Sequence, residues 1–233
     1  MDTMDILARP APTPQRPLLG TTVLLVEDSR YASEAVRLLA LRSGARIRRA
    51  DCLASARRHL ETYRAGVAIV DLGLPDGSGL DLIQRLHRAT QRPQVILATS
   101  GRPREEVELD CLDAGADGFL PKPIESLAAF QQTILCHMPR DDWPRGLRPV
   151  GSEQVEPDRL ALSDDLVYAG RLLEDDNVKP VFVADFLQGL ARTGHDNELL
   201  IRSRTLAARD RDDIRPELRA LIEARLPTTR RVI

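Results

Sequence analysis

The chain alternates short apolar runs with longer segments in which apolar residues recur every three or four positions. Runs of four apolar residues lie at 23–26, 67–70 and 95–98. Such runs are typical of strands that helices cover on both faces, since neither face can then be polar. Helical spacing between the runs, as at Leu80 and Ile83, predicts that strands and helices alternate. We therefore expect an α/β fold with a parallel sheet.

Charged residues follow these runs where each strand should end. Glu27 and Asp28 follow the first run, Asp71 follows the second, and Lys122 follows Gly-Phe-Leu-Pro. The carboxyl ends of parallel strands share one edge of a sheet, so these residues should meet there. Crowded carboxylates repel each other unless a cation lies among them, and Mg²⁺ accepts one or two carboxylates together with a phosphate oxygen. The pattern predicts one acidic site for a metal ion and a phosphoryl group.

The basic residue at this edge is an unusual choice for this chain. Among 33 basic residues, only Lys122 and Lys179 are lysine. A lysine side chain is a compact point charge on a flexible stem, which can follow a phosphoryl group or pair with a carboxylate in its absence. The use of lysine at position 122 therefore supports a phosphoryl site.

A simpler interpretation of these residues is helix capping. Asp28 or Ser29 could cap a helix over residues 31–41, as acidic and hydroxyl residues after strands often do. For Asp71 taken alone, capping and a functional role are equally good interpretations. The whole set of residues, together with the turn Leu-Pro-Asp-Gly-Ser-Gly that follows Asp71, favours the functional one.

Three motifs, VLLVEDS, VDLGLPDGSG and FLPKP, resemble those of the response regulator receiver domain, the phospho-accepting half of two-component signalling. They occur in the order of that family, and the resemblance covers about residues 20–139. It implies a doubly wound, flavodoxin-like parallel sheet of five strands in the order 2-1-3-4-5. It also implies a signalling phosphoacceptor, not an enzyme, that receives its phosphoryl group from a sensor histidine kinase or a histidine phosphotransfer protein.

The same resemblance assigns roles to individual residues. Asp71 would accept the phosphoryl group, and Lys122 would hold one of its oxygens. Asp28 would bind Mg²⁺ directly, Glu27 would bind it mostly through water, and the backbone carbonyl of Gly73 would complete the protein ligands.

Receiver domains also carry a switch hydroxyl after the fourth strand, and the sequence Ala-Thr-Ser-Gly offers two. Ser100 lies 22 residues before Lys122, which is the spacing that we associate with the family. Thr99 would need one extra residue in the loop, so the spacing favours Ser100. Phe119 matches the aromatic residue that turns inward when the switch engages.

Proline-rich stretches divide the chain into four parts. We expect a flexible tail at residues 1–19, the receiver domain at 20–139, a linker at 140–157 and a helical domain at 158–233. Within the linker, Trp143 could dock onto one of the domains.

Composition is that of an ordinary soluble protein, with 42% apolar and 29% charged residues. No apolar run approaches the ~18 residues of a membrane span, and the first residues lack the pattern of a secretory signal. We therefore expect a cytoplasmic protein. Its three cysteines show no metal-like spacing and should be reduced thiols.

The last part of the chain has helical spacing throughout. Candidate helices cover residues 158–173, 180–191, 196–208 and 216–226, which together predict a small bundle. We expect this bundle to act as an interaction or dimerisation module, with an unidentified protein partner or a second copy of the chain.

The alternative is a transcriptional regulator whose helical domain binds DNA. From residue 141 onward, 15 basic residues face 18 acidic ones, which argues against nucleic acid as a partner. A local basic helix is conceivable, but acidic residues interrupt it, so a mixed-charge surface is the favoured interpretation. Its basic residues are Arg202, Arg204, Arg209 and Arg211.

Overall fold

A five-stranded parallel sheet forms the centre of the computed structural model, which describes residues 11–146, 152–209 and 214–227. The strand order is β2-β1-β3-β6-β7. Two further short strands form a separate hairpin, so this order is the predicted 2-1-3-4-5 and the fold class is confirmed. The sheet strands are β1 (Thr22–Val26), β2 (Arg46–Ala50), β3 (Val67–Asp71), β6 (Val95–Thr99) and β7 (Gly118–Phe119), and the hairpin strands are β4 (Gly73–Leu74) and β5 (Gly77–Ser78).

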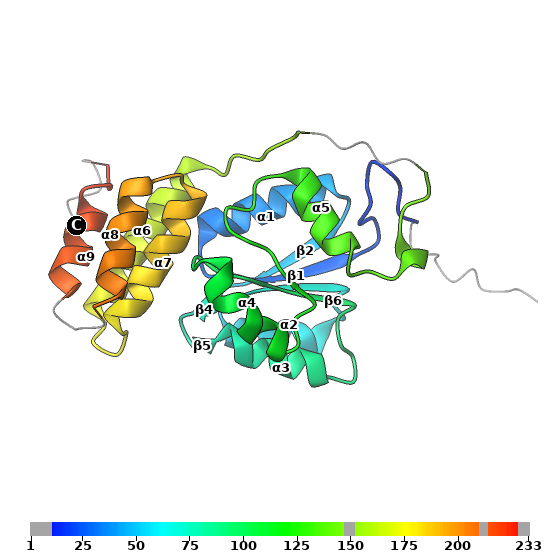
Figure 1. Cartoon of the computed structure of the whole chain (residues 1–233), viewed down its shortest axis with the longest axis horizontal. Helices are drawn as coiled ribbons and strands as arrows, with labels where there is room; N and C mark the ends of the chain where they lie inside the picture. The colour runs from blue at the N-terminus through cyan, green and yellow to red at the C-terminus, as the bar shows by residue number, and fades with distance from the viewer. Residues whose placement is uncertain (1–10, 147–151, 210–213, 228–233) are drawn as a thin grey trace, which may run out of the picture.

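Helices cover both faces of the sheet (Figure 1). Alternate residues of β1 point to opposite faces: Val23 and Leu25 join one apolar core, and Leu24 and Val26 join the other. The first core contains residues of α1 (Arg30–Arg42) and α5 (Leu127–Leu135). The second core contains residues of α2 (Leu53–Thr62), α3 (Gly79–Arg88) and α4 (Arg104–Asp113). Both faces are buried, which is why the central strands are apolar throughout.

The strand β2 is the exception, because it lies at the edge of the sheet. Its sequence, Arg-Ile-Arg-Arg-Ala, leaves all three arginines exposed. No apolar run marks this strand, so the pattern that predicts the other strands does not detect it.

The described end of the predicted flexible tail packs against the α/β part of the chain. Residues 1–10 lie outside the described part of the chain, but Leu18 is fully buried in the core and its backbone N–H donates to the carbonyl of Ser43. Leu18 lies within the tail predicted for residues 1–19, and its apolar side chain completes the core beside α1.

The C-terminal region is helical, as expected. It contains α6 (Arg159–Glu174), α7 (Pro180–Thr193), α8 (Asn197–Ala207) and α9 (Arg215–Glu223), which lie side by side at one end of the sheet (Figure 1). Asp158 and Asp196 cap α6 and α8, and Pro180 occupies the first position of α7. Apolar residues of all four helices share one core, which Tyr31 of α1 also joins.

The described part of the predicted linker packs against the α/β part of the chain. A short 3₁₀ helix, Arg140–Asp142, precedes Trp143, whose partly buried ring packs on the core next to α5. Further along, Val155 is buried in the same core. The domain boundaries themselves stay predictions.

Two features of the described residues bear on cellular context. None of the described helices is long and apolar enough to cross a membrane. All three cysteines are free thiols, and only Cys111 is buried.

Candidate phosphoryl and metal site

Three carboxylates converge where β1 and β3 end. Glu27 and Asp28 directly follow β1, and Asp71 is the last residue of β3. One ligand oxygen from each of the three lies within 4.8 Å of the others, and all three side chains are buried. Because neighbouring parallel strands end at the same edge, the position of each residue in the sequence is sufficient to bring them together.

Lys122 joins this cluster from the segment after β7. Its Nζ lies 2.7 Å from Glu27 Oε2 and 3.0 Å from Asp71 Oδ2. Burial would lower the pKa of Lys122, but the charges of Asp71 and Glu27 outweigh it and raise the pKa above its ordinary value. The lysine is therefore a cation that bridges two of the three carboxylates.

Asp28 has no such partner. Both of its carboxylate oxygens are buried, and neither accepts a hydrogen bond from any residue that the structure describes. Burial, followed by the charges of Glu27 and Asp71, raises the pKa of Asp28 well above its ordinary value. Burial likewise raises the pKa of Glu27 to about 7, against the opposing charge of Lys122. A buried carboxylate without a donor beside two others fits a hard divalent cation with oxygen ligands.

Two hydroxyls lie beside Asp71. Thr99 pairs directly with Asp71 across β3 and β6, and its Oγ1 is buried without a hydrogen-bond partner. Ser100 is also buried, but its Oγ already accepts a hydrogen bond from the backbone N–H of Arg102, at 3.1 Å. Of the two hydroxyls, only that of Thr99 has no hydrogen bond among the described residues.

The other two predicted site residues lie close to this edge. Gly73 lies two residues after Asp71 and is the exposed first residue of the hairpin strand β4. Phe119 is 5% exposed and belongs to the core under α2, α3 and α4, so its ring is turned inward.

The helical region covers this edge of the sheet, which the sequence does not predict. Asp165 of α6 is 1% exposed and accepts three hydrogen bonds from the start of α1. Ser29 Oγ donates at 2.7 Å, and the backbone N–H groups of Arg30 and Tyr31 each donate at 2.9 Å. These N–H groups belong to the first turn of α1, where no intrahelical partner exists, so Asp165 caps a helix of the receiver.

The helix α7 lies against the loop after β6. A Cβ atom on Gly101 would lie 2.5 Å from the backbone N of Gly189, so the two backbones meet where no side chain fits. Arg192 Nε donates to the carbonyl of Gly101 at 2.7 Å. A Cβ on Gly189 would lie 3.8 Å from Lys122 Nζ, which places the backbone of α7 directly beside the acidic cluster. Asp71 is accordingly only 7% exposed.

A cleft of about 1500 Å³ reaches Asp28 from outside. It runs between the loops that follow β1, β2 and β3 on one side and α6 and α9 on the other. Tyr168 and Asp165 of α6 line it next to Asp28.

Apolar spacing does not point to the residues that make this cover. It shows only that the helices carrying Asp165 and Gly189 each have a buried face. The one available signal was the presence of an aspartate and a glycine within predicted helices, since both residues are poor helix formers.

Comparison with known proteins agrees with this geometry. Residues 23–134 match the sequence model of the response regulator receiver domain. This part of the chain is a response regulator receiver domain, and the matched segment ends before α6.

Two transcriptional regulators are among its curated relatives. The KDP operon transcriptional regulatory protein KdpE of Escherichia coli (strain K12) is 36% identical over 103 residues, which are 44% of this chain and 45% of the relative. The virulence transcriptional regulatory protein PhoP of Shigella flexneri is 33% identical over 115 residues, which are 48% of this chain and 51% of the relative. The chain therefore spans about half the length of the curated relatives it matches.

Solved structures of response regulators also resemble this chain. A putative response regulator from Chloroflexus aurantiacus matches with a TM-score of 0.47 and 23% identity, over 50% of this chain and 97% of the other. The chemotaxis response regulator CheY4 of Vibrio cholerae matches with a TM-score of 0.47 and 22% identity, over 51% of this chain and 98% of the other.

Proposed function

We propose that Asp71 accepts a phosphoryl group and that the protein is a two-component response regulator. The observation that carries this proposal is the position of Lys122 Nζ, which bridges Glu27 and Asp71 beside the unpartnered carboxylate of Asp28. An acceptor needs a nucleophilic carboxylate, a cation that can follow the transferred oxygens, and a site for a divalent metal ion. All three lie within one cluster of the receiver domain.

The reaction is a displacement at phosphorus. An Oδ of Asp71 attacks the phosphorus of a phosphohistidine, the P–N bond breaks, and the freed imidazole of the donor takes up a proton. Lys122 exchanges its contact with the Asp71 carboxylate for a contact with an oxygen of the transferred group. Such charge stabilisation is the main contribution of a protein to phosphoryl transfer.

Asp28, Asp71 and the Gly73 carbonyl would hold Mg²⁺, with Glu27 acting mostly through water. When bound, Mg²⁺ supplies positive charge for the phosphoryl oxygens. The unpartnered oxygens of Asp28 support this assignment, because a buried carboxylate without a donor is costly unless a cation is present.

For the switch hydroxyl we propose Thr99 in preference to Ser100, because its hydroxyl is free to bond a phosphoryl oxygen.

We propose that the helical region is the output of this switch. Because α6 and α7 cover the edge that carries Asp71, a histidine kinase or phosphotransfer protein can reach the acceptor only if these helices move. The phosphorylated and unphosphorylated receiver would then hold the helices differently and expose different surfaces to a protein partner or a second copy of the chain.

DNA binding is the second candidate for the output, because KdpE and PhoP are named as transcriptional regulators. The arginines that could form a basic helix are largely paired with acidic residues. Arg202 pairs with Glu198, and Arg204 pairs with Glu106 of the receiver. Arg209 pairs with Glu217. Arg211 lies outside the described residues. This pairing supports a mixed-charge surface and leaves protein interaction as the favoured output.

The test is phosphorylation by acetyl phosphate, followed by the mass of the intact protein, with and without Mg²⁺. We expect labelling only with Mg²⁺ and none in Asp71→Asn. The control is Asp81→Asn, which makes the same chemical change at an exposed residue of α3 and should label normally. Full labelling of Asp71→Asn, with circular dichroism unchanged, would assign the acceptor elsewhere.

A further inference from the structure

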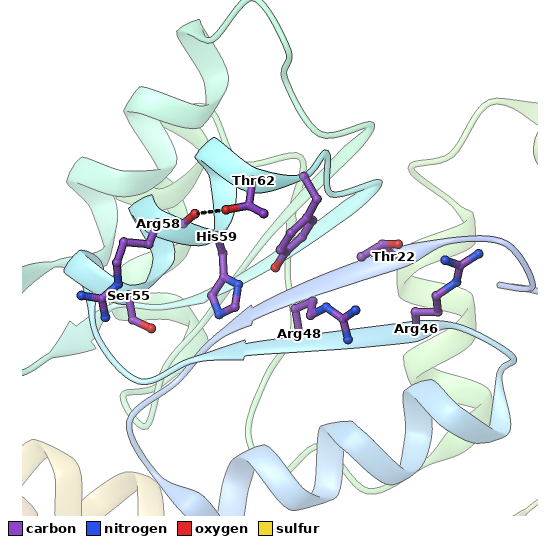
Figure 2. Close-up of a pocket in the computed structure, with 8 residues that line it drawn as sticks. Thr22, Arg46, Arg48, Ser55, Arg58, His59 and Thr62 are labelled. Atoms are coloured by element: carbon purple, nitrogen blue, oxygen red, sulfur yellow. Dashed lines mark hydrogen bonds between the residues drawn. The ribbon is translucent and has the colours of Figure 1, made fainter.

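A basic groove lies between the helix α2 and the edge strand β2 (Figure 2), and no residue of the acidic cluster lines it. Figure 2 shows Arg46 and Arg48 on the strand, with Ser55, Arg58 and His59 on the helix that faces it. Arg46 and Arg48 are two residues apart in an extended strand, so they share one face and lie about 6.6–6.8 Å apart along it. The groove has a volume of about 710 Å³, within the usual range of small-molecule sites.

The positive charge of this groove is not neutralised. Among the described residues, Arg46, Arg48 and Arg58 form no ion pair, and no acidic residue lines the groove. The surrounding segment, residues 42–66, contains seven arginines and only two acidic residues, although the whole chain has a net charge of −2. Positive charge is therefore concentrated in one place on a slightly acidic protein.

Hydroxyl groups complete the lining. Thr22, Ser55, Thr62 and Tyr63 all line the groove, and of these Thr62 Oγ1 already donates to the carbonyl of Arg58 at 2.8 Å (Figure 2). Among the described residues, the buried hydroxyl of Tyr63 has no hydrogen-bond partner, and burial raises the pKa of Tyr63 to about 12, so the hydroxyl keeps its proton. A hydroxyl donor in a groove of guanidinium groups without ion pairs matches an anionic ligand, whose oxygens accept hydrogen bonds.

A hydrogen bond joins the two walls of the groove, because His59 Nε2 of α2 donates to the carbonyl of Arg49 on β2 at 3.0 Å. Within the helix wall, the ring of His59 packs edge to face on that of Tyr63, with centroids 5.5 Å apart. Neither contact uses the guanidinium groups of Arg46, Arg48 or Arg58. The charged side chains are thus available to a ligand.

Protection of an exposed strand edge is the simpler explanation for arginines on β2. Charged side chains on an edge strand prevent pairing with another sheet. That role accounts for Arg46 and Arg48, but it does not account for Arg58, which comes from a helix and lines the same groove. Nor does it account for the buried hydroxyl of Tyr63.

We propose that this groove binds an oligophosphate anion, such as inorganic tripolyphosphate or the phosphate chain of a nucleotide. Guanidinium groups donate in a fork that matches phosphate oxygens, and hydroxyl groups donate to the oxygens that remain. Three guanidinium groups in one groove match a ligand with several phosphate groups better than a single phosphate. The site is independent of Asp71, so this proposal does not rest on the function of the receiver.

Binding is measured by isothermal titration calorimetry with tripolyphosphate, ATP and inorganic phosphate, in EDTA so that metal chelation does not contribute. We expect tripolyphosphate and ATP to bind at least tenfold more tightly than phosphate. The double variant Arg46→Gln/Arg48→Gln should bind tripolyphosphate and ATP at least tenfold more weakly, because the loss of one hydrogen bond between charged groups already lowers affinity about tenfold. Both arginines are exposed, so the variant should fold normally.

The matched control is Arg57→Gln/Arg64→Gln, which removes two exposed charges from the same segment outside the groove and should bind normally. An equal loss of affinity in both variants would mean that anions bind through the overall positive charge of this segment and not in the groove, which would overturn the proposal. The absence of binding by tripolyphosphate and ATP would also overturn it. A further arm uses a 20-base-pair DNA duplex. Binding of the duplex without binding of tripolyphosphate or ATP would reject an oligophosphate ligand.

Discussion

Asp28 is surrounded by negative charge from both parts of the chain. Glu27 and Asp71 lie within the same cluster, and the charge of Asp165 on α6 also raises the pKa of Asp28. Among the described residues, neither oxygen of Asp28 has a hydrogen-bond donor. At the scale of single residues, the repulsion among these carboxylates therefore destabilises the edge that carries Asp71 whenever no metal ion is bound.

The first prediction is that stability without metal falls as pH rises. Folding raises the pKa of Glu27 to about 7 and that of Asp28 as well, so the folded protein holds protons that the unfolded chain has lost. Protonation of these two groups therefore adds to the free energy of unfolding. The whole contribution is present below about pH 4, the ordinary pKa range of carboxyl groups, and it is lost as the pH rises to about 7. Urea unfolding in EDTA at several pH values between about 4 and 7 measures this free energy.

Asp28→Asn removes one of these carboxylates. We expect it to raise the free energy of unfolding at pH 7 in EDTA by on the order of 1 kcal/mol, the usual size for a buried group without a partner. The gain should shrink toward pH 4, and Mg²⁺ should stabilise the wild type more than the variant. A variant that is less stable than the wild type at pH 7 in EDTA would contradict this electrostatic account.

The second prediction separates the two hydroxyls. Thr99→Val removes the hydroxyl that has no partner, while Ser100→Ala removes one that already bonds Arg102. Both variants should label at Asp71, but Thr99→Val should prevent phosphorylation from changing amide exchange in α6 and α7, and Ser100→Ala should not. The opposite result would mean that the spacing to Lys122, which favours Ser100, is the better guide.

The residues of the acidic cluster could be predicted because each follows a buried strand, and parallel strands end at one edge. The switch hydroxyl stays a prediction, because the spacing to Lys122 favours Ser100 while the hydrogen bonds favour Thr99. The role of Asp165 could not be predicted for another reason. Two of its three partners are backbone N–H groups, at Arg30 and Tyr31, which every sequence supplies.

At the scale of elements, α7 and the loop after β6 pack backbone against backbone. The third prediction uses the two glycines at this contact. Gly101→Ala would bring a Cβ within 2.5 Å of the backbone N of Gly189, so α7 must shift, at a cost of about 1–3 kcal/mol. We expect faster labelling of Asp71 by acetyl phosphate, because the cover is loosened.

Gly189→Ala is the matched control, because its Cβ would lie 3.8 Å from both Gly101 Cα and Lys122 Nζ, which is ordinary contact. It should leave labelling unchanged and gain up to about 1 kcal/mol from the better helix propensity of alanine. Labelling rates measured over time by intact mass compare the two. Equal rates in both variants would show that this contact does not limit access to Asp71.

Among the strands, sequence patterns predict those that are buried on both faces and fail for the edge strand β2. The runs at β1, β3 and β6 are apolar because helices cover both sides of the sheet. The edge strand β2 has one exposed side and carries arginines there, so its sequence resembles a loop. The four C-terminal helices were predicted from their spacing, but the spacing does not say which surface they cover.

At the scale of the whole molecule, α6 and α7 bring acidic residues to an edge that is already acidic. Asp165 comes from α6, and on α7 burial raises the pKa of Asp185, with the charge of Asp71 among the smaller causes. A phosphoryl group on Asp71 would add further negative charge and volume beside Gly189. We therefore expect phosphorylation to weaken the docking of the helices.

The fourth prediction tests this weakening directly. With a beryllofluoride mimic of phospho-Asp71, amide exchange should become faster in α6 and α7 and at the start of α1, where the N–H groups of Arg30 and Tyr31 bond Asp165. Exchange within β3 should not change. Hydrogen–deuterium exchange with mass spectrometry, combined with the mass in solution, measures both undocking and association. Identical exchange with and without the mimic would mean that the receiver alone carries the signal.

The cap that Asp165 gives to α1 also allows the C-terminal helices to influence the acidic cluster. Coupling between two sites is reciprocal. If a phosphoryl group or its mimic in the acidic cluster weakens the docking of the helices by some factor, docking of the helices weakens binding in the cluster by the same factor. A partner that binds only the undocked helices would therefore increase the fraction of molecules whose Asp71 is open to a donor, without touching the receiver. In such a system the downstream partner would set how readily the protein responds to its kinase.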